Sequence, residues 1–139
     1  MIQIVRTDEA ELKEFTTREW RAYDVDHYGK AVDWIEEPFF LKAVEQGQIV
    51  GSASGRYTSG IVYISELLVS RIHLRRGIGR LLMEKIEQFG KKLGAHKIQL
   101  HTGRGWDSVG FYEALGFREV AQLPDHHFHK DFVIYEKYL

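Results

Sequence analysis

The sequence contains no cysteine, only two prolines, and no apolar run that approaches the roughly 20 residues of a membrane span. The absence of cysteine excludes disulfide bonds, a thiolate nucleophile and a zinc–thiolate site. Basic and acidic residues are balanced, 19 against 20, so the formal net charge of -1 gives no general attraction to nucleic acid or to acidic membranes. We therefore expect a soluble cytoplasmic protein with no nucleic-acid partner and no membrane partner.

The length of 139 residues suits one domain with a single core, and no repeat, low-complexity segment or linker interrupts the chain. We predict one domain over residues 1–139. The periodicity of apolar residues predicts alternating helices and strands, with residues 24–38 less regular. Helices are expected at 8–23, 78–93 and 107–115, and strands at 2–5, 39–45, 48–57, 61–69, 97–102, 117–122 and 131–138.

The expected strand at 61–69, IVYISELLV, is apolar on both faces. Such a strand is typical of the middle of a sheet that helices cover on both sides. Glu66 is the only carboxylate within it. In such surroundings a carboxylate is either desolvated, with a raised pKa, or paired with a cation such as Arg56 or Arg71.

The segment from His73 to Met83, HLRRGIGRLLM, places two glycines and three arginines where this strand gives way to an amphipathic helix. The glycines let a ligand approach the backbone closely, and the free N–H groups and the dipole of the helix start favour negative charge. The side chains of Arg75, Arg76 and Arg80 add positive charge. These features predict a binding site for a diphosphate.

Two other phosphate-binding motifs do not match this segment. A P-loop would require lysine and then serine or threonine after Gly79, and neither is present. A dinucleotide fingerprint would require a third glycine at Leu82 and an acidic residue closing the next strand, which ends instead in His101 and Thr102. The remaining candidate is the pyrophosphate turn of acyl-CoA-binding proteins.

Two motifs resemble those of the GNAT superfamily of N-acetyltransferases. Residues 75–80, RRGIGR, are similar to the Gln/Arg-x-x-Gly-x-Gly/Ala element, although Leu74 stands where the family usually has Gln or Arg. Residues 108–117, SVGFYEALGF, are similar to the Ala-x-x-Phe-Tyr-x-x-x-Gly-Phe segment, although Gly105 and Ser108 replace its customary Asn and Ala. The resemblance covers roughly residues 39–139.

The resemblance implies an α+β GNAT fold, a mixed and strongly twisted sheet of about six to seven strands with helices on both faces. It implies acetyl-CoA as cosubstrate, no metal, and direct acetyl transfer to a small-molecule or peptide amine in a ternary complex. Relatives often form homodimers. In the family, backbone groups of the buried strand pair with the pantetheine amides. The residues expected to bind the cofactor are Leu67, Leu68, Val69, Leu74, Arg75, Arg76, Gly77, Ile78, Gly79, Arg80, Ser108, Phe111 and Tyr112.

The same resemblance makes Tyr112 and Glu66 the candidate catalytic residues. Acyl transfer from a thioester expels a thiolate, and a phenol with an ordinary pKa of about 10 can protonate the departing sulfur. Relatives that acetylate polyamines and sugar amines carry an acid at the position of Glu66, where it would accept the amine proton or bind the amine. The structural alternatives are a core aromatic for Tyr112 and an ion pair for Glu66.

Two further segments contain candidate functional side chains. His126, His127 and His129 have a spacing that can bind a metal, but no further ligand is evident, so we interpret them as a solvated or acceptor-lining loop. The stretch at 20–34 is acidic and aromatic, which suits either a pocket for a cationic amine or a helix pair with aromatic core residues. Its notable residues are Trp20, Tyr23, Asp24, Asp26, His27, Tyr28 and Trp34.

The competing function is a non-catalytic acyl-CoA-binding or sensing module. Such a module would keep Gly77 and Gly79 but would need neither Tyr112 nor a base. The presence of Tyr112 favours the enzyme.

Overall fold

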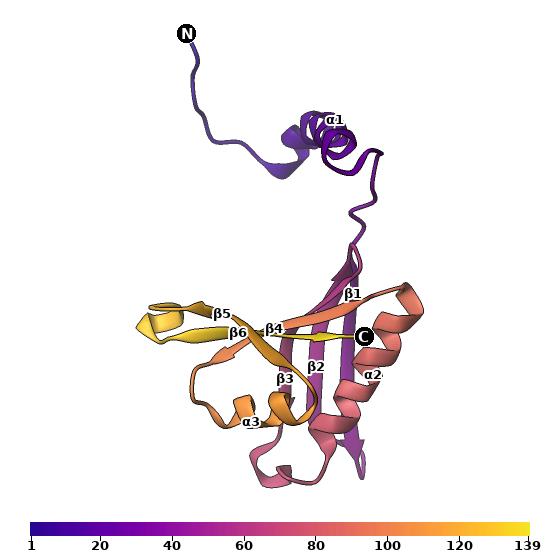
Figure 1. Ribbon diagram of the computed structural model, residues 1–139, viewed down its shortest axis with the longest axis vertical. Helices are drawn as coiled ribbons and strands as arrows, with labels where there is room; N and C mark the ends of the chain where they lie inside the picture. The colour runs from indigo at the N-terminus through magenta and orange to yellow at the C-terminus, as the bar shows by residue number, and fades with distance from the viewer. The chain divides into compact units, whose positions relative to one another are not determined.

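The computed structural model describes all 139 residues and comprises two compact units, Met1–Trp34 and Ile35–Leu139 (Figure 1). The first unit contains helix α1 (Glu9–Tyr28), and the second contains every strand. The extent of a single domain over residues 1–139 stays a prediction. None of the helices combines the length and the apolar character that crossing a membrane requires.

Helix α1 begins at an N-cap, Asp8, whose side chain accepts a hydrogen bond from the N–H of Glu11. The helix extends beyond the predicted end at residue 23 to Tyr28. It ends there because the C-cap, Gly29, adopts the left-handed conformation with φ 76°. The predicted strand at 2–5 is wrong. That segment pairs with no other strand, and the side chains of Ile2 and Ile4 are about nine-tenths exposed.

The second unit is built on one six-stranded sheet in the order β1-β2-β3-β4-β6-β5. Only β3 and β4 are parallel neighbours, and the other neighbours are antiparallel, so the expected mixed sheet in an α+β fold is confirmed. The strands are β1 (Glu37–Glu45), β2 (Gln48–Thr58), β3 (Ile61–Val69), β4 (Lys97–Gly103), β5 (Arg118–Leu123) and β6 (Phe132–Tyr138).

Helix α2 (Ile78–Leu93) has the predicted bounds, because a left-handed glycine lies at each end, Gly77 at the start and Gly94 at the stop. It packs against β1, β2 and β3 (Figure 1). Helix α3 (Asp107–Ala114) contacts β4. Both helices contribute to one hydrophobic core, whose largest fully buried side chains are Phe117, Met83, Ile86, Ile98, Val62 and Val133.

Strand β3 lies in the interior of the sheet, as predicted, but it is not buried along its whole length. Val62 and Ile64 are buried, whereas Glu66 and Leu68 are exposed. The pairing register with β2 shifts between Ser54 and Gly55, so one extra residue of β3 forms a bulge at this point. In the first half of the strand one face is buried and the other, with Ile61 and Tyr63, is only half-buried, so the expectation of two covered faces is wrong.

Candidate active site

The sheet opens between β3 and β4. These parallel strands pair only through Ile61–Tyr63 of β3 and Lys97–Gln99 of β4. Beyond that point β3 continues to Val69 and β4 to Gly103, each paired only with its outer neighbour. The inner edges therefore carry free backbone N–H and C=O groups, to which an extended ligand with amide groups can add as a strand.

The turn between β3 and α2 exposes backbone donors at a helix start. Arg75 and Gly77 have positive φ, 62° and 82°, and no side chain caps the first N–H groups of α2. The first turn also contains no acidic residue. Since the free N–H groups and the helix dipole favour an anion, this end of α2 can hold a phosphate group.

Gly79 has a role that the sequence did not indicate. It is buried, and a Cβ atom there would lie 3.0 Å from Cζ of Phe111. Gly79 therefore has a packing role, since the missing side chain lets α3 pack against the first turn of α2, and its role in letting a ligand approach stays a prediction. At Gly77 a Cβ would meet nothing within 4 Å, so glycine serves the positive φ there.

The three arginines of the turn differ in their surroundings. The guanidinium of Arg76 donates to both carboxylate oxygens of Glu45 at the end of β1, over 3.3 and 2.5 Å. These hydrogen bonds lower the pKa of Glu45. Arg75 and Arg80 are exposed and form no ion pair. Arg76 therefore ties the turn to β1, and the other two guanidinium groups are free to meet an anion.

Close contacts hold β3, α2 and α3 around the opening. A Cβ at Gly51 of β2 would lie 3.2 Å from the carbonyl oxygen of Leu68 and 2.9 Å from Cγ2 of Ile78, so β3 and α2 approach the same point. The hydroxyls of Thr102 and Ser108 lie 2.6 Å apart and join the end of β4 to α3. The cofactor segments predicted from sequence are thus brought together at one end of the sheet.

Tyr112 on α3 combines a buried ring with an accessible hydroxyl. The side chain is 7% exposed, and its ring lies edge-on to those of Phe111 and Phe117. Burial raises the pKa of the phenol, which is therefore protonated at neutral pH. The hydroxyl forms no side-chain hydrogen bond, yet the only buried side-chain N or O atom without a partner is Nδ1 of His73. The phenol oxygen therefore reaches the surface, where it can donate a proton.

Glu66 does not have the surroundings that its sequence suggested. It is exposed, lies opposite Ser54 of β2, and forms no ion pair or hydrogen bond. The expectation of a desolvated or ion-paired carboxylate is wrong, because the strand is exposed beyond its bulge. Arg56 pairs instead with Glu36 at 3.3 Å and lies over the ring of Tyr63.

A pocket of about 490 Å³ lies beside the start of the strand opening. Ser65 of β3 and His101 of β4 contribute to its wall. The pKa of His101 is lowered, first by burial and then by the nearby His126 and His127. Sequence reasoning missed His101, because its neighbours come from separate elements and only the topology of the sheet reveals them. The complete lining is Arg56, Tyr63, Ile64, Ser65, Gln99, Leu100, His101, His127 and Phe132.

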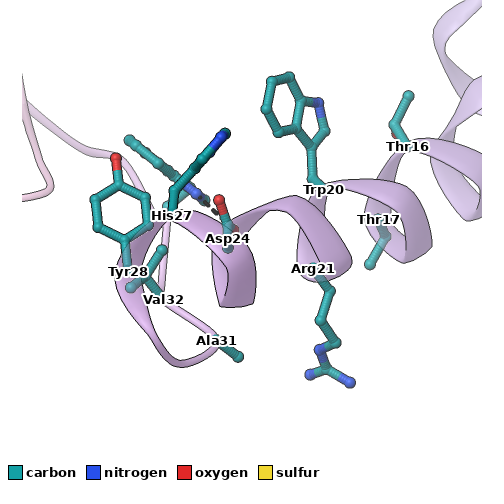
Figure 2. A pocket seen from close by; sticks show the side chains of 10 residues that line it. Thr16, Thr17, Trp20, Arg21, Asp24, His27, Tyr28, Ala31 and Val32 are labelled. Carbon is teal, nitrogen blue, oxygen red and sulfur yellow. Dashed lines mark hydrogen bonds between the residues drawn. The ribbon is translucent and has the colours of Figure 1, made fainter.

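The first unit has a pocket of its own, of about 690 Å³, along α1 and the segment after it (Figure 2). Asp24 is buried there and accepts a hydrogen bond of 2.9 Å from Nε1 of Trp34. From the acidic and aromatic stretch identified in the sequence, Tyr23 and Asp26 do not line it. The side chains from that stretch that do are Trp20, Asp24, His27, Tyr28 and Trp34.

The profile of the acetyltransferase (GNAT) family matches residues 6–117. The chain belongs to the GNAT family. The match includes the whole strand opening, the turn at α2 and the aromatic pair of α3. The suggested family relationship is therefore confirmed.

The relatives of this GNAT-family chain are distant in sequence. An uncharacterized N-acetyltransferase of Chlorobaculum tepidum is 31% identical over 84 residues, which are 60% of this chain and 52% of the relative. The chain thus spans about half the length of that curated relative. An acetyltransferase from Bacillus cereus has a TM-score of 0.77 at 23% identity, over 99% of this chain and 98% of the other. An acetyltransferase from Bacillus anthracis, solved with acetyl coenzyme A, has a TM-score of 0.69 at 18% identity, over 73% and 62%.

Proposed function

We propose that the protein is an acetyl-CoA-dependent N-acetyltransferase that transfers the acetyl group directly to an amine in a ternary complex. The observation that carries the proposal is the opening between β3 and β4, which begins after Tyr63 and Gln99 and ends beside the uncapped start of helix α2. An amide-containing arm with a diphosphate at one end matches that combination of free strand edge and free helix N–H groups.

In this proposal the pantetheine arm pairs with the backbone of Leu67, Leu68 and Val69. The diphosphate lies at the turn from Leu74 to Arg80, where the N–H groups of Gly77, Ile78 and Gly79 and the guanidinium groups of Arg75 and Arg80 meet its charge. Arg76 acts mainly through its ion pair with Glu45, which fixes the turn. Helix α3 forms the remaining wall of the cofactor site with Ser108, Phe111 and Tyr112.

The chemical step needs no metal. The amine nitrogen attacks the thioester carbon, a backbone N–H near Leu68 polarises the carbonyl, and the C–S bond breaks as the amide forms. The proton on the Tyr112 hydroxyl passes to the departing sulfur, and the phenolate then takes up a proton from solvent. The surplus proton of the amine passes to Glu66 through water, since that carboxylate is exposed and unpaired.

The acceptor is a small-molecule or peptide amine. Structural relatives have names that include both kinds, namely a ribosomal-protein-S18-alanine N-acetyltransferase from Escherichia coli and a streptothricin acetyltransferase from Bacillus anthracis. We place the reaction in the cytoplasm, in keeping with a balanced, cysteine-free sequence.

A thiol-release assay tests the proposal. The purified chain is mixed with acetyl-CoA and a panel of amines and peptides, with longer acyl-CoAs in parallel, and the products are weighed by mass spectrometry. We expect thiol release that depends on both substrates and an amine product heavier by one acetyl group. If calorimetry shows that the chain binds acetyl-CoA but no acceptor in the panel is acetylated, the result would instead support the acyl-CoA-binding or sensing module.

A further inference from the structure

Three imidazoles from two separate segments meet beside the strand opening. His101 lies on β4, and His126 and His127 lie in the connection between β5 and β6. One ring nitrogen from each lies within 4.8 Å of one from each of the others. All three side chains are exposed, and none forms a hydrogen bond or ion pair. Their ring nitrogens are therefore free to act as ligands.

The connection between β5 and β6 is held in a defined shape. The backbone N–H of Asp125 donates to the carboxylate of Asp131 over 2.9 Å, and the N–H of His126 donates to the carbonyl of Lys130 over 2.8 Å. The aromatic ring of Phe132 lies 4.9 Å from that of His127 and 5.6 Å from that of His126. These contacts fix the backbone that carries His126 and His127 on the same side of the sheet edge as His101, whose ring lies 6.0 Å from that of His126 between centroids.

We propose that His101, His126 and His127 form a binding site for a divalent transition-metal ion, with Zn²⁺ as the best match. Imidazole is a preferred ligand of Zn²⁺, Ni²⁺ and Cu²⁺, whereas Mg²⁺ and Ca²⁺ prefer carboxylate and carbonyl oxygens, which this cluster lacks. Zinc–nitrogen bonds of about 2.0–2.1 Å require the nitrogens to close to roughly 3.4 Å, and exposed side chains can rotate that far. A water molecule would occupy the fourth position.

The site is placed to affect the pocket beside the opening without taking part in acetyl transfer. His101 and His127 line that pocket, so an ion bound by them would lie at its rim. The proposed transfer uses Tyr112 and Glu66 and requires no metal. The metal site is therefore independent of the proposed function.

Titration of the metal-free chain with Zn²⁺ tests the site. Calorimetry should give one ion per chain for the wild type, and Co²⁺ in its place should give the strong visible absorption of a tetrahedral complex. His101→Ala, His126→Ala and His127→Ala should each weaken Zn²⁺ binding at least about tenfold, since loss of a ligand exceeds the usual effect of losing an outer-shell partner. His96→Ala, an exposed histidine outside the cluster, should bind as the wild type does.

Equal Zn²⁺ affinity in the wild type and in His101→Ala would overturn the proposal, as would the absence of any stoichiometric binding by the wild type. Thermal melts of each variant separate loss of ligand from loss of fold. Because the readout is metal binding without acetyl-CoA, failure here would leave the proposed acetyl transfer untouched, and failure of the thiol-release assay would leave the metal site untouched.

Discussion

Tyr112 can lose its hydroxyl without disturbing the core, because the ring is packed while the oxygen reaches the surface without a side-chain partner. We expect Tyr112→Phe to keep acetyl-CoA affinity and stability nearly unchanged. Loss of a positioned general acid should lower the single-turnover rate of acetyl transfer by roughly 10² to 10⁴. Single-turnover measurement avoids the ambiguity of a product-release step.

Tyr135→Phe is the matched control. Tyr135 is also buried, but its hydroxyl donates to Glu113 over 2.9 Å, so the variant should lose about 1 kcal/mol of stability and no rate. An unchanged single-turnover rate in Tyr112→Phe would return Tyr112 to the role of a core aromatic.

Glu66 has no ion pair to lose, so its substitution separates catalysis from stability clearly. Glu66→Gln should lower the transfer rate near neutral pH and recover part of it at high pH, where the free amine is abundant. The free energy of unfolding should stay within about 0.5 kcal/mol of wild type. Glu84→Gln, an exposed carboxylate on α2, should change neither quantity. If Glu66→Gln transfers acetyl groups at the wild-type rate across the pH range, Glu66 is not the general base.

At the scale of elements, the arginines of the turn before α2 have two roles. Arg76 stabilises the turn through its ion pair, and Arg75 and Arg80 are free to bind the ligand. Arg80→Ala removes an unpaired guanidinium, and we expect acetyl-CoA affinity to fall about tenfold, equivalent to about 1.4 kcal/mol, with little loss of stability. The loss should shrink at high salt. Titration calorimetry measures it, with Arg118→Ala, an exposed arginine on β5, as the control. A loss no larger than that of the control would remove Arg80 from the site.

The sequence predicts the bounds of an element correctly where residues at its own ends mark them. Helix α2 was placed correctly because Gly77 and Gly94 mark both ends. Sequence reasoning failed where the pairing between strands decides the structure. The segment at 2–5 has strand-forming residues but no partner strand, and the bulge that exposes Glu66 exists only in the register between β2 and β3. The Arg76–Glu45 pair joins residues 31 positions apart, and no local pattern indicates it.

At the scale of the whole molecule, one ion pair of the sheet makes the stability of the fold depend on pH. The carboxylate of Glu136 lies 2.9 Å from Nζ of Lys97 and accepts a hydrogen bond of 2.7 Å from Gln99. Burial alone would raise the pKa of Glu136, but the hydrogen bonds from Gln99 and Lys97 outweigh it and lower the pKa. A lowered pKa in the folded state means stability that is present above the ordinary glutamate pKa of about 4.3 and is lost on acidification.

Glu136→Gln should therefore destabilise the protein by about 1–3 kcal/mol at neutral pH. The difference from wild type should narrow as the pH falls below about 4. Urea denaturation at a series of pH values checks this, and Glu84→Gln, which loses no partner, should follow the wild type throughout. A destabilisation that stayed constant down to low pH would show that the charge of Glu136 contributes nothing.

The central claim is that acetyl-CoA occupies the opening between β3 and β4 with its diphosphate at the start of α2. Hydrogen exchange of the wild-type chain, measured with and without saturating acetyl-CoA, tests it most directly. The amides within 65–69 that do not pair with β2, and those at 77–80 at the start of α2, should exchange fast alone and become protected on binding. Unchanged exchange in both segments at saturation, or protection confined to residues 16–34, would contradict the claim.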